Sequence, residues 1–331
     1  MYRTALAAAT ALLFTTSLAE ANSLDAINAM ACGTDAPHPS QVSSSIGATY
    51  SRAQSKPRLD KGTDEQFHAM VKLKMIYQHD GFAEIEHCGG TLIDSRYVMT
   101  AAHCVFVPEG QKHWQHIEVM VGETKIGGEY SIKRKAREAV CHAGHDEYLA
   151  NDIALVKLDE PMPADIRPAK IDEYRRPTVR PGAIAIAAGW PVTGPRAGEK
   201  HLRKTPLSVT DVEWPGFITV TSPFGRAEGV CQGESGGPLL SSVNGRESVA
   251  GVLSGIEPGT NDAFGEPCMK AGYDMYYTPI AAYREWIEGV MDICSDDPDE
   301  CRGKGSPGFF LSEGSSSWHN FPASKRFESA D

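Results

Sequence analysis

Three short segments, far apart in the chain, contain the residue types that nucleophilic catalysis needs. They are Thr100-Ala101-Ala102-His103-Cys104, Asn151-Asp152-Ile153-Ala154-Leu155 and Gly233-Glu234-Ser235-Gly236-Gly237-Pro238. A serine hydroxyl is a weak nucleophile unless a base accepts its proton, and a neutral imidazole can be that base near neutral pH. A buried carboxylate orients the imidazole and stabilises its charged form. His103, Asp152 and Ser235 therefore form a candidate constellation for acyl transfer.

Glycines flank Ser235 on both sides. They allow the backbone N–H groups of Gly233 and Ser235 to point into one concavity, where they would stabilise a developing oxyanion by about 3 kcal/mol each. Taken singly, each of the three segments also has a structural interpretation as a packed histidine, a turn or a glycine-rich loop. The order His, Asp, Ser is more specific, because the other two well-known triads follow different orders along the chain.

At these residues the sequence resembles the trypsin/chymotrypsin-like serine peptidases. The resemblance covers roughly Leu59 to Ile293 and includes His87-Cys88-Gly89-Gly90-Thr91-Leu92, Gly189-Trp190 and Trp286-Ile287. It implies an all-β fold of two packed six-stranded antiparallel β-barrels with a C-terminal α-helix, and a site between the barrels.

The resemblance also implies the roles of the site residues. Ser235 would be the nucleophile, His103 the general base and then acid, and Asp152 the orienting carboxylate. Gly233 and Ser235 would form the oxyanion hole. Ser254 would support the aspartate and pair with substrate backbone, and the other substrate-binding positions would be Gly229, Val230 and Gln232.

The floor of the primary pocket indicates the substrate preference. In this family the residue six positions before the serine lies at the bottom of that pocket, and here it is Gly229. A carboxylate there would select Arg or Lys, because a buried cation must be paired. Gly229 offers none, so the pocket resembles that of elastase-like members, which accept small or medium apolar side chains. Met275 would make the pocket shallower, and Glu266 and Asp274 are near enough in sequence to add a charge.

An even number of cysteines, eight in all, fits a set of four disulfides. The resemblance implies Cys88–Cys104 beside the histidine and Cys231–Cys268 beside the primary pocket. Cys294–Cys301 is compatible with their short spacing, and Cys32–Cys141 would then tether the N-terminal segment to the domain. Zinc binding is the competing interpretation, but C-x-x-C pairs are lacking, so no metal is expected. The pairs His113/His116 and His142/His145 are interpreted as loop histidines.

Three features depart from the family pattern. Glu234 replaces the usual Asp before the serine, which pairs in activated family members with a new N-terminal ammonium. The usual Ile-Val-Gly-Gly start is absent, and cleavage after Arg58 would instead free Leu59. Two alternatives are open: Glu234 pairs with that terminus, or it pairs with a side chain in a protein that needs no cutting. In addition, Gly255 replaces the usual Trp after the supporting serine.

The strands that must position these residues are predicted from one recurring sequence pattern. Short apolar stretches alternate with turn residues, which is typical of a β-barrel or sandwich. These predicted strands are Met70–Tyr77, Thr91–Ala101, Ile117–Val121, Ile153–Leu158, Ala183–Ala188, Ile218–Thr221, Pro238–Leu240 and Ser248–Ser254. A helix is predicted after Pro279, because Ala282, Trp286, Ile287, Val290 and Ile293 recur at helical spacing.

The regions outside this domain have their own signatures. Residues 1–21 resemble a secretory signal that ends in Ala19-Glu20-Ala21, with a membrane anchor as the less favoured alternative. Residues 22–58 are polar and are predicted to be a pro-segment or flexible arm, and residues 59–293 form the peptidase domain. Residues 294–331 are a C-terminal extension, mostly disordered, or else docked through aromatics such as Trp318.

Composition narrows the function further. Apolar residues make up 41% and the net charge is −11, which fits a globular protein and argues against nucleic-acid binding. We predict a secreted or periplasmic serine endopeptidase without cofactor, acting on protein or peptide substrates, with an activating protease as a partner if Arg58 is cut. No membrane span is expected once the signal is removed. The alternative is a non-catalytic or latent homologue that binds protein ligands in the same cleft.

Overall fold

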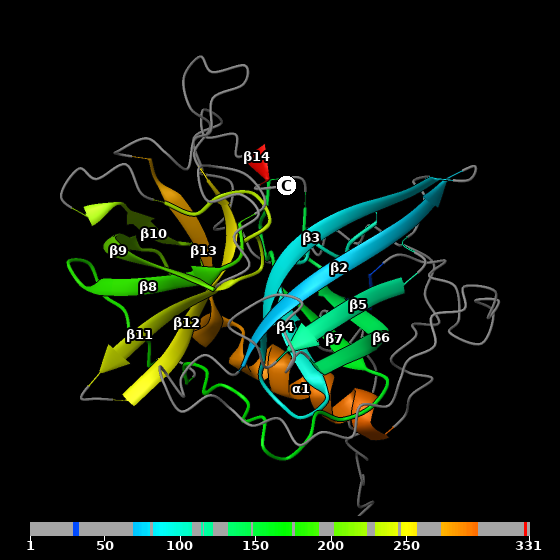
Figure 1. Cartoon of the computed structure of the whole chain (residues 1–331). Helices are drawn as coiled ribbons and strands as arrows, with labels where there is room; N and C mark the ends of the chain where they lie inside the picture. The colour runs from blue at the N-terminus through cyan, green and yellow to red at the C-terminus, as the bar shows by residue number, and fades with distance from the viewer. Residues whose placement is uncertain are drawn as a thin grey trace, which may run out of the picture.

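Figure 1 shows a computed structural model of the chain, in which two groups of strands lie side by side. The structure describes residues 29–32, 69–79, 82–107, 114, 116–121, 132–146, 148–173, 176–191, 202–223, 229–243, 246–256, 273–296 and 328–329.

The first group of strands is an antiparallel barrel. Its strands are β2 (Met70–His79), β3 (Phe82–Leu92), β4 (Tyr97–Thr100), β5 (His116–Val121), β6 (Ile132–His142) and β7 (Ala154–Leu158). They pair in the order β6-β5-β2-β3-β4-β7, and a further pairing of β6 with β7 closes the barrel. Burial alternates along β5, as expected when one face of a strand meets a core.

The second group repeats this arrangement. Its strands are β8 (Ile184–Gly189), β9 (Arg203–Val212), β10 (Ile218–Thr221), β11 (Pro238–Val243), β12 (Arg246–Ile256) and β13 (Met275–Pro279). They pair in the order β11-β8-β9-β10-β13-β12, and β11 also pairs with β12 to close the barrel. Each barrel has its own apolar cluster. The predicted fold of two six-stranded antiparallel barrels is thereby confirmed.

A short extra strand lies on each barrel, which brings each sheet to seven strands. Strand β1 (Ala29–Ala31) pairs with β6, and the disulfide Cys32–Cys141 fastens the same segment to the same strand. Strand β14 (Glu328–Ser329) pairs with β12 opposite Gly255 and Ile256. Residues 294–296 of the predicted extension belong to the C-terminal helix, and the other residues of the predicted arm and tail lie outside the described residues.

The helix after the last barrel strand packs on the first barrel. Pro279 ends β13, a 3₁₀ turn follows at Ile280–Ala282, and α1 (Arg284–Asp296) then runs beneath the first barrel in Figure 1. Its apolar residues Trp286, Ile287 and Val290 belong to the core cluster of that barrel. The helix predicted from the spacing therefore exists, and it begins one short turn later than Pro279. Within the described residues, no helix has both the length and the apolar character to cross a bilayer.

We expect the tether at β1 to stabilise the first barrel. Replacing Cys32 and Cys141 together by serine should lower the free energy of unfolding by about 2–4 kcal/mol, because a cross-link between distant residues restricts the unfolded chain. Urea unfolding of the wild-type protein and the double variant measures this difference.

Proteolysis between residues 33 and 68 supplies the control. In the wild-type protein, the N-terminal fragment should separate on a gel only after reduction, whereas in the double variant it should separate without reductant. Equal unfolding free energies, or release of the wild-type fragment without reduction, would contradict the tether.

Candidate active site

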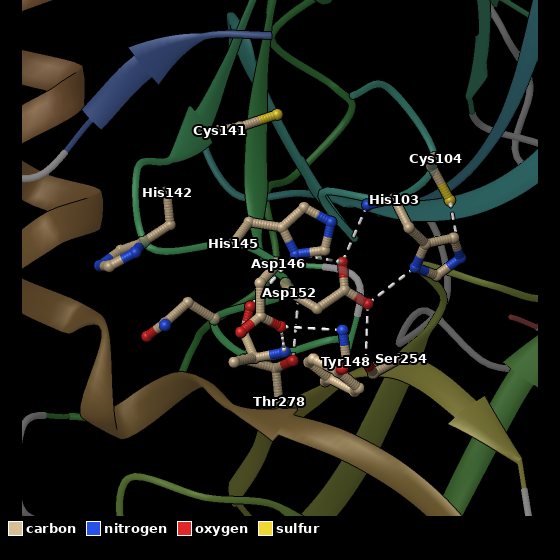
Figure 2. Close-up of polar contacts among 12 residues, drawn as sticks. His103, Cys104, Cys141, His142, His145, Asp146, Tyr148, Asp152, Ser254 and Thr278 are labelled. Carbon is tan, nitrogen blue, oxygen red and sulfur yellow. Dashed lines mark hydrogen bonds and ion pairs between the residues drawn. The ribbon is translucent and has the colours of Figure 1, made fainter. Parts of the chain in front are cut away.

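The pairing of β4 with β7 brings His103 and Asp152 together. Thr100 at the end of β4 lies opposite Ala154 at the start of β7, so the turn after one strand meets the residues before the other. The Nδ1 atom of His103 lies 2.7 Å from Oδ2 of Asp152, and the backbone N–H of His103 donates to Oδ1 at 2.9 Å. Figure 2 shows both contacts at the same carboxylate. With Nδ1 held by a carboxylate, Nε2 is the nitrogen left to accept a proton.

Asp152 also contacts two strands of the second barrel. Ser254 in β12 donates from its hydroxyl to Oδ2 of Asp152 at 2.6 Å, and Thr278 in β13 donates to the backbone carbonyl of Asp152 at 2.9 Å. Burial alone would raise the pKa of this carboxyl, but the charge and hydrogen bond of His103, with smaller effects of His145 and Ser254, lower the pKa to about 2. Asp152 is therefore a carboxylate throughout the neutral pH range.

The loop that carries Ser235 packs against the first barrel close to His103. Its glycines Gly233 and Gly236 have φ angles of +84° and +75°, which glycine adopts at little cost. A Cβ on Gly236 would lie 2.2 Å from the hydroxyl of Thr100, so a larger residue does not fit. The N–H of Gly89 in β3 donates to the carbonyl of Ser235 at 2.6 Å. The serine loop and the histidine turn therefore meet at the interface of the barrels.

The hydroxyl of Ser235 is buried and makes no hydrogen bond to any described residue. The Nε2 atom of His103 lies 3.8 Å from Sγ of Cys104. Within the described part of the chain, the N–H groups of Gly233 and Ser235 donate to no backbone carbonyl. The structure thus brings the three predicted residues to one interface, with the His103–Asp152 pair formed and the serine hydroxyl without a hydrogen-bond partner among the described residues.

The sulfur atoms near His103 are not available to a metal. Cys88, His103 and Cys104 have ligand atoms within 4.8 Å of one another, but Cys88 and Cys104 form a disulfide. Disulfide sulfur is a poor ligand compared with a thiolate, so this cluster does not fit a zinc site. Cys231 and Cys294 are also disulfide-bonded. Their expected partners, Cys268 and Cys301, lie outside the described residues.

The residues expected to bind substrate lie around the same loop. Val230 is buried, and its N–H donates to the sulfur of Met275 at 3.4 Å. Gln232 is exposed, whereas Ser254 is buried against Asp152. Met275 thus lies beside Gly229 and Val230, where the sequence placed the pocket. Glu266 lies outside the described residues.

An arginine that the sequence analysis missed pairs with Glu234. The Nη2 atom of Arg203, at the start of β9, lies 3.0 Å from Oε2 of Glu234, and both side chains are buried. The same guanidinium donates to the carbonyl of Gly229. Of the two alternatives for Glu234, the structure contains the side-chain partner, while Leu59 lies outside the described residues. The sequence pattern that could have revealed Arg203 is the two-residue alternation of β9, which puts Arg203 on the same inward-facing side as Thr205, Leu207 and Val209.

A second histidine also lies beside Asp152. The Nδ1 atom of His145 is 3.8 Å from Oδ1 of Asp152 and donates to the carbonyl of Ala150 at 3.1 Å. The interpretation of the paired histidines as loop residues was wrong for His116 and His142, which belong to β5 and β6. Neither spacing nor composition distinguished His145, because its position depends on the contact between distant strands.

The low pKa of Asp152 leads to a pH-dependent contribution to stability. A carboxyl whose pKa is about 2 in the folded state, against an ordinary value of 3.8, stabilises the fold above the ordinary value and loses this effect as the pH falls toward 2. The wild-type protein should therefore lose about 2 kcal/mol of unfolding free energy relative to Asp152→Asn between pH 5 and pH 2. Urea unfolding across that range measures the difference.

The exposed carboxyl of Asp165 provides the matched control. The variant Asp165→Asn should follow the wild-type curve. If Asp152→Asn also ran parallel to wild type from pH 5 to pH 2, the buried ion pair would not be stabilising the fold.

Known proteins share this sequence pattern. A family model described as Trypsin matches residues 60–287. Trypsin eta of Drosophila melanogaster is 29% identical over 215 residues, which cover 60% of this chain and 75% of that protein. Granzyme M of Rattus norvegicus is 28% identical over 227 residues, covering 64% and 82% respectively. The beta subunit of clotting factor G of Tachypleus tridentatus is 31% identical over 233 residues, covering 61% and 70%. The chain belongs to the trypsin family.

Proposed function

We propose that this protein is a serine endopeptidase in which Ser235, His103 and Asp152 carry out the reaction. The observation that carries the proposal is the hydrogen bond between His103 and the buried Asp152, beside the glycine-flanked loop of Ser235. Membership of the trypsin family supports it, as does the similarity to Trypsin eta.

The reaction would proceed through an acyl-enzyme. The Oγ atom of Ser235 attacks the scissile carbonyl carbon while its proton moves to Nε2 of His103. The carbonyl oxygen becomes an oxyanion, which the N–H groups of Gly233 and Ser235 stabilise. His103 then gives its proton to the leaving amine, and a water molecule repeats the sequence to release the acid. Asp152 holds Nδ1 of His103 and stabilises the imidazolium.

A hydrogen bond between the hydroxyl of Ser235 and Nε2 of His103 must form for this reaction to begin. Ser235 Oγ has no hydrogen-bond partner among the described residues, and Nε2 of His103 lies beside the sulfur of Cys104. Catalytic hydrogen bonds are often formed fully only in the substrate complex. In this proposal, the side chains of Ser235 and His103 move into hydrogen-bonding distance when substrate fills the cleft.

The primary pocket would accept small or medium apolar side chains. Gly229 brings no carboxylate, and the buried sulfur of Met275 contacts Val230 next to it. The group bonded to the carbonyl of Gly229 is the guanidinium of Arg203, whose charge is balanced by Glu234, so Glu234 is not an unpaired carboxylate that could bind a basic side chain. These three observations favour Ala or Val over Arg or Lys at the cleaved position.

The proposal includes export from the cytoplasm. Residues 1–21 would be the signal, residues 22–58 the pro-segment, residues 59–293 the peptidase domain, and residues 294–331 an extension. The disulfides Cys32–Cys141 and Cys88–Cys104 support a secreted or periplasmic location, because disulfides persist mainly in oxidising compartments. Its partners would be protein or peptide substrates.

Changing Ser235 to alanine should abolish hydrolysis of peptide substrates, lowering kcat by at least about 10⁴-fold, because no other group supplies the nucleophile. The fold should be unchanged, since the hydroxyl makes no hydrogen bond to a described residue. Active-site labelling by an organophosphonate, followed by mass spectrometry, should modify the wild-type protein and Ser208→Ala but not Ser235→Ala. A mature wild-type protein that neither reacts with the phosphonate nor cleaves peptides would favour the ligand-binding alternative.

Shortening Met275 should enlarge the pocket. In Met275→Ala, kcat/KM for substrates with Phe or Leu at the cleaved position should rise about tenfold relative to Ala substrates, because several buried heavy atoms have left the site. The measurement is hydrolysis of a matched peptide series, with Met120→Ala on β5 as the control. A wild-type preference for Arg or Lys, or an unaltered series in Met275→Ala, would overturn the assignment of the pocket.

A further inference from the structure

The ion pair of Arg203 and Glu234 lies directly behind the proposed oxyanion hole. Glu234 stands between Gly233 and Ser235, whose N–H groups would bind the oxyanion. Its Oε2 atom accepts from Nη2 of Arg203 at 3.0 Å and from the N–H of Cys231 at 2.7 Å. Because Glu234 is the residue between Gly233 and Ser235, the position of its side chain affects the position of both N–H groups.

A carboxylate in this position needs a cation. Glu234 is only 3% exposed, and burial raises the pKa of its carboxyl, while the guanidinium of Arg203 and the N–H of Cys231 lower it. An ionised group left without its partner in such a site is strongly unfavourable. The other titratable group that faces the pair among the described residues is the buried hydroxyl of Tyr277 in β13. Arg203 is thus the source of the positive charge for Glu234 in the described structure.

Arg203 also spans the loop from its beginning to the residue before Ser235. One Nη2 atom donates both to the carbonyl of Gly229 and to the carboxylate of Glu234. The carbonyl of Glu234 in turn accepts from the N–H of Gly237 at 2.9 Å. A planar guanidinium fixes two acceptors in a defined geometry, so this contact determines the shape of the loop.

The space around Glu234 fits its longer side chain. A Cβ at Gly189, the last residue of β8, would lie 2.8 Å from Cγ of Glu234 and 2.9 Å from its Oε1. Gly189 therefore makes room for a glutamate that extends toward β9. The carboxylate reaches Arg203 across this gap, inside the second barrel.

We propose that Arg203 is a positioning residue that holds residues 229–235 in the oxyanion-binding conformation through its ion pair with Glu234. The proposal rests on the proposed function and extends it. Arg203 supplies the positive charge that a newly cut N-terminus supplies in activated family members, so the peptidase site forms without cleavage after Arg58. Arg203 itself does not contact the substrate.

The test uses the full chain carrying Arg58→Gln, so that cleavage at this position is prevented. In that background we compare Arg203, Arg203→Lys, Arg203→Met and the charge-free pair Arg203→Met with Glu234→Gln. Lys204→Met, an exposed neighbour on β9, is the matched control for loss of a positive charge. N-terminal sequencing verifies the uncut chain, and near-ultraviolet circular dichroism verifies folding.

We expect the chain with Arg58→Gln to hydrolyse peptides at the wild-type rate. Arg203→Met should lower kcat by about 10²–10³-fold with little change in KM, which is the effect of losing an oxyanion contact, and Arg203→Lys should restore part of it. The activity of Arg203→Met should also fall as the pH rises, because the unpaired Glu234 is tolerated only in its protonated form. The charge-free pair should have low kcat without this decline, and it should fold even if Arg203→Met does not.

Two results would overturn the positioning role while leaving the proposed function intact. One is an inactive Arg58→Gln chain beside an active wild-type protein, which would mean that the cut terminus is required. The other is an unchanged kcat in Arg203→Met, or an equal alkaline decline in the charge-free pair. By contrast, a wild-type protein without any hydrolysis or phosphonate labelling would refute the proposed function itself.

Discussion

The buried carboxylate of Asp152 is the interaction on which the arrangement of the site depends. An ionised group deprived of water must be surrounded by donors, and Asp152 receives them from both halves of the molecule. His103 comes from the first barrel and Ser254 from a strand of the second, while Thr278, also in the second barrel, donates to the backbone carbonyl of Asp152. The same contacts that neutralise the burial cost of this group therefore fix the relative position of the two barrels. The active site and the interface of the barrels are therefore built from the same contacts.

Two buried carboxyls lie in this small region, and their surroundings give them different properties. Asp152 is held ionised by a histidine and several donors, which lower its pKa to about 2. For Glu234, burial is the larger effect and raises its pKa, although Arg203 opposes it. One carboxylate orients a catalytic imidazole, and the other supports the backbone of a loop. Their different environments assign different tasks to the same chemical group, as is common in enzyme sites.

Much of this structure could be predicted from sequence, and the exceptions have physical reasons. Strands with a clear apolar pattern, such as β5 and β7, were found, and so was the terminal helix. The predicted stretch Thr91–Ala101 proved to be the end of β3 and the whole of β4, joined by a turn in which Asp94 accepts from the N–H of Arg96. β6 was missed because its first half is charged and solvent-facing, and β9 because it begins with a buried arginine. The motifs identified the residues at the barrel interface, but the Arg203–Glu234 pair and His145 required knowledge of which strands meet.

The packing of α1 affects the order in which the chain can fold during its synthesis. The helix follows the final barrel strand, yet its side chains Trp286, Ile287 and Val290 complete the core of the first barrel. The earliest barrel in the sequence thus lacks part of its interior until almost the entire polypeptide has been synthesised. A nascent chain emerging from a ribosome or a translocation pore would leave the apolar surface that α1 later covers exposed until the helix has been synthesised. Protection of that surface by chaperones would matter more than for a chain in which each apolar core is completed by the strands of its own barrel.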